Sequence, residues 1–297
     1  MFSQCLQNVS KYTLPVIFSR RLYDGRIGSG CGSFLVVNRE GWVLTAAHIV
    51  SDIATININS PEIAKFEHER DIIINSGLHE KDKRKRLQLL KSNPDWITDQ
   101  AVSWGGLPWQ ISNFHGDPIA DIAIGKFEGF DPSLIASYPV FKNPAEPMLP
   151  GTSLCRLGFP FHQINATFDP VTRKFALAPN VLPIPRFPND GIHTRVPVVI
   201  SPDGQRQVKF VETSSPGLKG QSGGPIFDQS GFVWALQSKT QSMALGFAPE
   251  IKEGNRKIVE HQFMHVGWGS HVEEIIKLFQ KHGVGFSMSG APSIPTT

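Results

Sequence analysis

The six residues 220–225, Gly-Gln-Ser-Gly-Gly-Pro, restrict what this chain can fold into more than any other segment. With glycine at about 7% and proline at about 5% of average composition, such a run arises by chance roughly once in a million positions. A serine hydroxyl attacks a carbonyl only if a base takes its proton and N–H groups receive the oxyanion. A glycine two residues before Ser222 allows the N–H groups of Gly220 and Ser222 to point at one spot, and the glycines behind it allow another backbone to pass closely.

A candidate base for that serine ends the segment 45–48, Thr-Ala-Ala-His. Histidine is the side chain whose ordinary pKa lies near neutrality, as a general base requires. Taken alone, the segment fits a structural histidine about equally well. The preceding residues 30–37 (GCGSFLVV) and 41–44 (GWVL) favour a catalytic His48 for the reason given below.

Short strands joined by turns are expected along most of the chain, because 27 glycines and 23 prolines in 297 residues suit a sheet protein better than a helical bundle. The candidate strands are residues 31–38, 42–45, 120–127, 153–159, 207–213, 225–228 and 231–238. Two helices are expected, one over 63–90 with a break near 75–77 and one over 271–281.

The motifs GxGSFLVV, GWVLTAAH, ADIAI and GxSGGPIF together resemble the trypsin/chymotrypsin-like serine proteases, especially their disulfide-free HtrA-like branch without a PDZ domain. The resemblance implies an all-β fold of two six-stranded antiparallel barrels, with the active site in the cleft between them. It implies His48 as general base, Asp121 as the carboxylate that orients it and Ser222 as nucleophile. The backbone N–H groups of Gly220 and Ser222 would form the oxyanion hole.

Two aspartates compete for the third triad position. Asp121 directly precedes Ile-Ala-Ile and matches the family's D-I-A motif, whereas Asp117 lies in a Gly-Asp-Pro turn where aspartate commonly caps its own backbone. We favour Asp121, and this choice rests on the resemblance.

The expected division places residues 1–135, with His48 and Asp121, in the first barrel, and residues 136–297, with Ser222 and the terminal helix, in the second. The 121 − 48 = 73 positions between base and carboxylate exceed the family's usual spacing, so residues 59–112 are interpreted as an insertion. Trp96, Trp104 and Trp109 lie in it. They suggest a lid or a dock for an activating partner protein, or they anchor the insertion to the barrel.

Substrate contacts are expected from the family pattern at Pro216, Gln237, Ser238 and Lys239, with residues 242–245 opposite Pro216. None of these is Asp or Glu, so a preference for Lys or Arg is not expected, and small or medium apolar residues are the alternative. The substrate is expected to be a polypeptide.

The compartment is interpreted from the cysteines and the N-terminus. Cys5, Cys31 and Cys155 are too few and scattered for a disulfide framework, and the first 21 residues lack a signal-peptide pattern. No stretch has the length of a membrane span. A cytoplasmic protein is expected, with no membrane contact.

The net charge of +3 comes from one segment, residues 78–91, where six Lys or Arg and two acids give +4 and leave −1 for the rest. A solvated helix face explains it better than a nucleic-acid site, so no nucleic-acid partner is expected.

Glu260, His261, His265 and His271 could in principle bind zinc, but residues 259–267 alternate like a strand, and no metal or other cofactor is expected. The function expected is that of a serine endopeptidase working through an acyl-enzyme. The alternative is a catalytically silent protein of the same fold that binds peptides.

Overall fold

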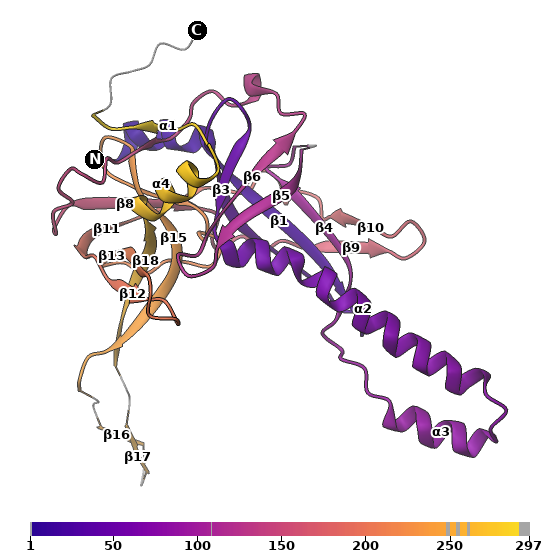
Figure 1. The fold of residues 1–297 in the computed structure, drawn as a ribbon. Coiled ribbons are helices and arrows are strands. Elements are labelled where there is room, and N and C mark those ends of the chain that lie inside the picture. The colour runs from indigo at the N-terminus through magenta and orange to yellow at the C-terminus, as the bar shows by residue number, and fades with distance from the viewer. Residues whose placement is uncertain (1, 108, 248–249, 254–255, 260–261, 291–297) are drawn as a thin grey trace.

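The body of the protein consists of two curled sheets that pack against each other (Figure 1). The structure is a computed structural model and describes residues 2–107, 109–247, 250–253, 256–259 and 262–290. Its four α-helices in the described residues are α1 Ser3–Tyr12, α2 Ala47–Asn75, α3 Glu80–Leu89 and α4 Val272–Lys281, and one short 3-10 helix, η1, covers Pro132–Leu134.

The first sheet has six antiparallel strands in the order β4-β1-β2-β3-β6-β5 and closes into a barrel. In chain order they are β1 Thr13–Leu22, β2 Ile27–Val36, β3 Trp42–Thr45, β4 Ile97–Trp104, β5 Gln110–Asp117 and β6 Ile122–Glu128. The predicted hairpin of residues 31–38 and 42–45 is formed by β2 and β3, with Phe34 opposite Thr45.

The second sheet has nine strands. They are β7 Val140–Phe141, β8 Ser153–Gly158, β11 Phe187–Arg195, β12 Val198–Ile200, β13 Gln207–Thr213, β14 Pro225–Phe227, β15 Phe232–Ala244, β18 Phe263–His271 and β19 Ser287–Met288. Two separate hairpins pair β9 Ala166–Asp169 with β10 Lys174–Leu177, and β16 Glu250–Glu253 with β17 Arg256–Val259. The predicted all-β architecture is confirmed. Six strands of the second sheet, β13, β11, β8, β14, β15 and β18, pair in a closed antiparallel ring, because β18 pairs with both β15 and β13. The short strands β7 and β19 extend this sheet beyond the ring by parallel pairing.

A continuous apolar core joins the two sheets. Phe34, Leu44, Ile124, Phe210 and Phe227 are each at most 1% exposed and belong to one cluster. Burying a side chain of this size stabilises the fold by about 1.5–3 kcal/mol. The core therefore holds the facing edges of the two sheets, where the candidate catalytic motifs lie, in a fixed relation.

The terminal helix α4 docks on this core through one apolar face, as its spacing predicted. Val272, Ile275 and Phe279 are fully buried, and the His271 ring accepts a hydrogen bond from the Glu273 N–H at the first turn. Gly283 follows the helix with φ +65°, a left-handed conformation that ends it.

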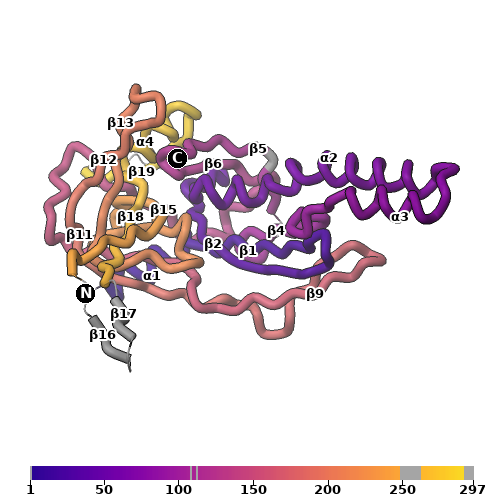
Figure 2. The backbone as a smooth tube through the Cα atoms, turned by 90° about the horizontal axis from the view of Figure 1, so that it is seen from below, coloured from indigo at the N-terminus to yellow at the C-terminus, as the bar shows by residue number. Residues whose placement is uncertain are grey.

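The helical arm, defined as α2 and α3, projects away from the body in both views (Figures 1 and 2). Its break after Asn75 was predicted, but α2 begins at Ala47 instead of residue 63. Strand β4 and the first residues of β5 lie within the stretch interpreted as an insertion, yet both strands are part of the barrel. Trp104 and Trp109 are accordingly buried beside Phe127.

Trp96 anchors the near part of the arm. Its ring packs against Phe66 of α2 and Tyr23, and its indole N–H donates to Glu62 at 2.8 Å. The anchoring alternative therefore describes these tryptophans, and none of them forms an exposed apolar surface.

Cys5, Cys31 and Cys155 are all free thiols. In the described part of the chain, no helix combines the length and apolar character needed to cross a membrane.

Candidate active site

His48 lies where β3 ends and α2 begins. Its Nδ1 is 3.0 and 2.9 Å from the two carboxylate oxygens of Asp121, and its backbone N–H donates to Oδ1 of the same residue at 3.0 Å. One carboxylate therefore orients the imidazole and also accepts from the N-terminus of the helix that carries it, where the helix dipole favours negative charge. The His48 side chain is 45% exposed, so its other ring nitrogen remains accessible.

Asp121 is held in the turn that precedes β6. Its φ of +53° is left-handed, a conformation that aspartate tolerates better than most residues. A second donor, the Ser238 hydroxyl on β15, reaches Oδ2 at 2.5 Å. Ser238 was expected among the substrate contacts, which stays a prediction, and its side-chain hydroxyl completes the carboxylate's hydrogen bonds across the two sheets.

The pKa values of this pair shift in opposite directions. The hydrogen bond to Asp121 raises the pKa of His48 above its usual 6.5, against the lowering effect of burial. Burial alone would raise the pKa of Asp121, but hydrogen bonds from His48 and Ser238 outweigh it and the pKa is lowered. Asp121 therefore stays ionised at neutral pH, and the imidazole is a stronger base than a free histidine.

The loop that carries Ser222 is locked against the first sheet. Ser33 donates its N–H to the Ser222 carbonyl at 2.8 Å and its hydroxyl to the Gly220 carbonyl at 2.9 Å. Gly223 has φ +80°, and a Cβ there would lie 2.1 Å from the Ser33 carbonyl oxygen. Only glycine fits this contact, which gives the Gly-Gly pair of the motif its structural reason.

Two backbone donors of this loop are free to bind a ligand. Gly220, at φ +98°, and Ser222 donate their N–H groups to no other described residue, whereas Gln221, Gly223 and Gly224 between and after them do donate. Buried or half-buried N–H groups are normally paired, so this free pair is suited to an oxyanion.

The Ser222 hydroxyl forms no hydrogen bond with any residue in the described ranges, His48 included. The structure thus brings His48, Asp121 and Ser238 into direct contact, and it joins Ser222 to the same region through Ser33 on β2. Hydrogen bonds between a nucleophile and its base are often long before substrate binds.

The other predicted substrate contacts have different environments. Gln237 is 2% exposed, and its backbone accepts from Gly223 and donates to Gly224, so it anchors the loop that carries Ser222. Lys239 is exposed, with its ammonium over the ring of Trp268. The Pro216 carbonyl accepts hydrogen bonds from Asn189 and Arg156. Arg156, far away in sequence, was not singled out by any motif.

A cavity of about 590 Å³ opens beside Gly220. Its walls include Cys31 of β2, Leu218 of the segment before Ser222, and residues 159 and 161–165. The residues between β8 and β9 therefore line a cavity beside the candidate active site.

Among the described residues, no group of three or more His, Cys, Asp or Glu side chains is placed to hold a metal ion. His265 bonds the Ser242 hydroxyl at 2.9 Å, and burial lowers the pKa of His271 to about 4. Glu260 and His261 lie outside the described residues.

Comparison with known proteins gives one family and several solved structures. Residues 30–236 match the model described as the trypsin-like peptidase domain. The chain is similar to the active form of the Rv3671c protease from M. tuberculosis, with TM-score 0.49 and 14% identity over 95% of this chain and 86% of that one. It is also similar to an HtrA-type protease, an AlgW variant with a tripeptide, with TM-score 0.49 and 12% identity over 95% and 63% of the respective chains. Among curated protein sequences, none matches this chain.

Proposed function

Because the chain belongs to the trypsin-like peptidase family, we propose that it is a serine endopeptidase with His48, Asp121 and Ser222 as its catalytic triad. The family is one of peptidases, as the sequence motifs predicted. The serine mechanism and the role of each residue are the proposal. The observation that carries it is the fixed set of contacts in which Asp121 binds the His48 ring and backbone and also accepts from Ser238.

In the proposed first step, the Ser222 Oγ attacks the substrate carbonyl while Nε2 of His48 takes its proton. Asp121 holds Nδ1–H of the ring, so Nε2 is the nitrogen free to accept. The oxyanion accepts from the N–H groups of Gly220 and Ser222. The C–N bond then breaks, the leaving amine takes the proton from His48, and an ester to Ser222 remains.

In the second step, water gives a proton to His48 and attacks the ester. The new acid leaves as the proton returns to Ser222, and the enzyme is regenerated. The cavity beside Gly220 lies next to the oxyanion donors and offers room for the part of the substrate that leaves first.

Incubation with an unfolded protein such as reduced casein tests this function. Wild type is expected to produce new peptides, and His48→Ala is expected to produce none. If both proteins bind the casein and neither cleaves it, the chain is the silent peptide-binding alternative.

The pH dependence of kcat/KM follows from the His48 pKa. The imidazole acts as a base only when neutral, so activity falls as the pH drops through its pKa. Because Asp121 raises that pKa, the acid limb is expected above pH 6.5. In Asp121→Asn the limb should move to lower pH along with the loss of rate. A profile of kcat/KM over about pH 5 to pH 9 checks both, and a limb that stays in place in the variant would contradict the pairing.

The helical arm is proposed to dock an activating partner or to control access of large substrates. Helix α2 starts one residue before His48, so a force on the arm acts on the helix that carries the base. Beyond the part anchored by Trp96, the arm exposes Ile72, Ile74 and Leu89 and the basic residues of α3.

Replacing residues 68–91 with a short Gly/Ser linker tests this role and keeps Phe66 and the Trp96 contact. Labelling of Ser222 by a small fluorophosphonate is expected to stay at the wild-type rate, while cleavage of a protein substrate changes several-fold. If the truncated protein is folded and both rates match wild type, the arm has no part in substrate access.

A further inference from the structure

The guanidinium of Arg156 is buried directly behind the nucleophile loop. Arg156 lies on β8 and is 1% exposed. Its Nε donates to the Gln237 side chain at 2.6 Å, and its Nη1 donates to the Ser215 hydroxyl at 2.7 Å and the Pro216 carbonyl at 3.3 Å. Its Nη2 is buried as well and has no partner among the described residues.

This cation also lacks a counter-ion. None of the ion pairs between described residues includes Arg156, although the buried carboxylate of Glu212 in the same sheet is paired with Arg195. Burial lowers the pKa of Arg156 to about 10, so it remains charged at neutral pH. A buried charge is normally paired or fully hydrogen-bonded, and here one nitrogen of a buried cation is left free.

The Arg156 guanidinium contacts the segments on both sides of the loop that carries Ser222. Ser215 and Pro216 belong to the segment that leads to Ser222, and Gln237 binds the backbone of Gly223 and Gly224 on the other side. The polar group therefore lies between the segment before the serine and the strand after it. The Thr240 hydroxyl on β15 also links these two segments, because it donates to the Gly217 carbonyl at 2.6 Å.

Two glycines, Gly217 before the Ser222 loop and Gly267 on β18, leave space for the Arg156 and Gln237 side chains. A Cβ on Gly267 of β18 would lie 2.2 Å from Nη2 of Arg156, and one on Gly217 would lie 2.1 Å from Nε2 of Gln237. Any larger residue would displace these groups. The two glycines therefore leave space for the Arg156 guanidinium and the Gln237 carboxamide, whose nitrogens are hydrogen-bond donors.

We propose that Arg156 makes this protein select a carboxylate side chain, glutamate or aspartate, at the substrate residue whose carbonyl Ser222 attacks. The inference rests on the proposed function and names its substrate class. The Gln237 carboxamide covers the guanidinium, and its Nε2 is held by one bond to the Lys239 carbonyl at 3.2 Å. A small rotation lets it donate to the incoming carboxylate, which also receives Nη2 of Arg156 and supplies the missing counter-ion. This replaces the expectation of a small or medium apolar residue.

Matched peptides that differ at one residue test the preference. In one pair the residue before the cleaved bond is Glu or Gln, in the second it is Asp or Asn, and a third peptide carries Leu. Wild type is expected to cleave the acidic member of at least one pair with a kcat/KM about 10²-fold above its amide, since a site built for a hydrogen-bonded partner rejects analogues that leave it unpaired. Equal rates for acid and amide in both pairs, or a preference for Leu, would overturn the inference.

The variant Arg156→Gln is expected to bring the acid-to-amide ratio close to one, while Arg26→Gln, which changes an exposed arginine in the first sheet, should keep the wild-type ratio. If Arg156→Gln does not fold, the wild-type peptide pairs decide alone. Labelling of wild-type Ser222 by a fluorophosphonate separates the two claims. A labelled protein without acidic preference refutes only the role of Arg156, whereas an unlabelled one refutes the proposed function and this inference with it.

Discussion

Replacing Ser222 with alanine is expected to reduce kcat for peptide-bond cleavage by roughly 10⁶-fold, close to complete loss. The hydroxyl oxygen is the atom that bonds to the substrate, and alanine offers no other nucleophile. Residual activity can come only from oriented water and the free N–H groups of Gly220 and residue 222. The measurement is the rate of peptide release from a protein or peptide substrate by purified variant and wild type.

The loss should be catalytic and not a loss of folding. The Ser222 hydroxyl bonds no described residue, and the contacts that lock the loop use its carbonyl and its glycine neighbours. The melting temperature is therefore expected to match wild type. Ser230→Ala, in the exposed turn before β15, is the matched control and should retain full activity. Near wild-type cleavage by Ser222→Ala would show that another residue is the nucleophile.

Replacing Asp121 with asparagine is expected to lower kcat by about 10⁴-fold. The carboxylate accepts from Nδ1–H of His48 and leaves Nε2 free to take the serine proton. An amide N–H placed against Nδ1 favours the opposite tautomer, and the charge that stabilises the imidazolium is lost. Asparagine tolerates the left-handed φ of this position, so the turn before β6 should keep its shape.

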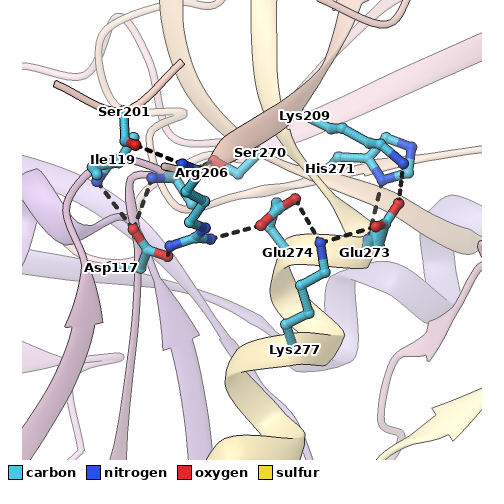
Figure 3. Close-up of polar contacts among 11 residues, drawn as sticks. Asp117, Ile119, Ser201, Arg206, Lys209, Ser270, His271, Glu273, Glu274 and Lys277 are labelled. Atoms are coloured by element: carbon cyan, nitrogen blue, oxygen red, sulfur yellow. Dashed lines mark hydrogen bonds and ion pairs between the residues drawn. The ribbon is translucent and has the colours of Figure 1, made fainter. Parts of the chain in front are cut away.

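Asp117→Asn is the matched control for this prediction, because Asp117 is the other aspartate of the same turn. Its Oδ1 accepts from the N–H groups of Ile119 and Ala120, and its Oδ2 pairs with Arg206 (Figure 3). Arg206 continues to Glu274 at 2.7 Å, so the network ties the turn to α4. The control is expected to lower the melting temperature slightly and leave kcat unchanged. A greater loss of kcat in Asp117→Asn than in Asp121→Asn would reverse the assignment.

The candidate catalytic segments could be located from sequence because their structural requirements are local. The glycine at position 223 must meet the Ser33 carbonyl, and the Asp121 carboxylate opens an apolar strand, so these needs appear as fixed residue types at fixed spacing. The apolar spacing of α4 was equally readable, since one face of a helix repeats about every 3.6 residues.

The arm was harder to predict. The first half of α2 is rich in β-branched residues, among them Ile53, Thr55 and Ile56, which lower helix propensity, and it contains Pro61. Contacts with the barrel compensate, including the Gln100 amide on the Ile53 carbonyl and the Ile97 N–H on Asn59. Tertiary contacts outweigh the low helix propensity of this segment. Trp104 and Trp109 were placed in an insertion for a different reason, because the extra length between His48 and Asp121 was assigned to residues 59–112, although β4 and β5 belong to the barrel.

Contacts between distant segments left no local pattern. Ser238 lies within β15 and looks in the sequence like any polar residue of a strand, and its bond to Asp121 depends on how the two sheets meet. Arg156 lies 216 − 156 = 60 positions before Pro216, within a strand that reads as ordinary. Only the folded chain brings Arg156 next to the segment that leads to Ser222.

The most direct measurement of the central claim is reaction of the purified protein with diisopropyl fluorophosphonate, followed by mass analysis of the intact chain and its peptides. The account predicts one phosphoryl adduct per chain, located on Ser222. The adduct should not form in Ser222→Ala or on wild-type protein unfolded before the reagent is added, and it should form much more slowly in His48→Ala. No adduct on the folded wild-type protein, or an adduct on another serine with Ser222 untouched, would contradict it.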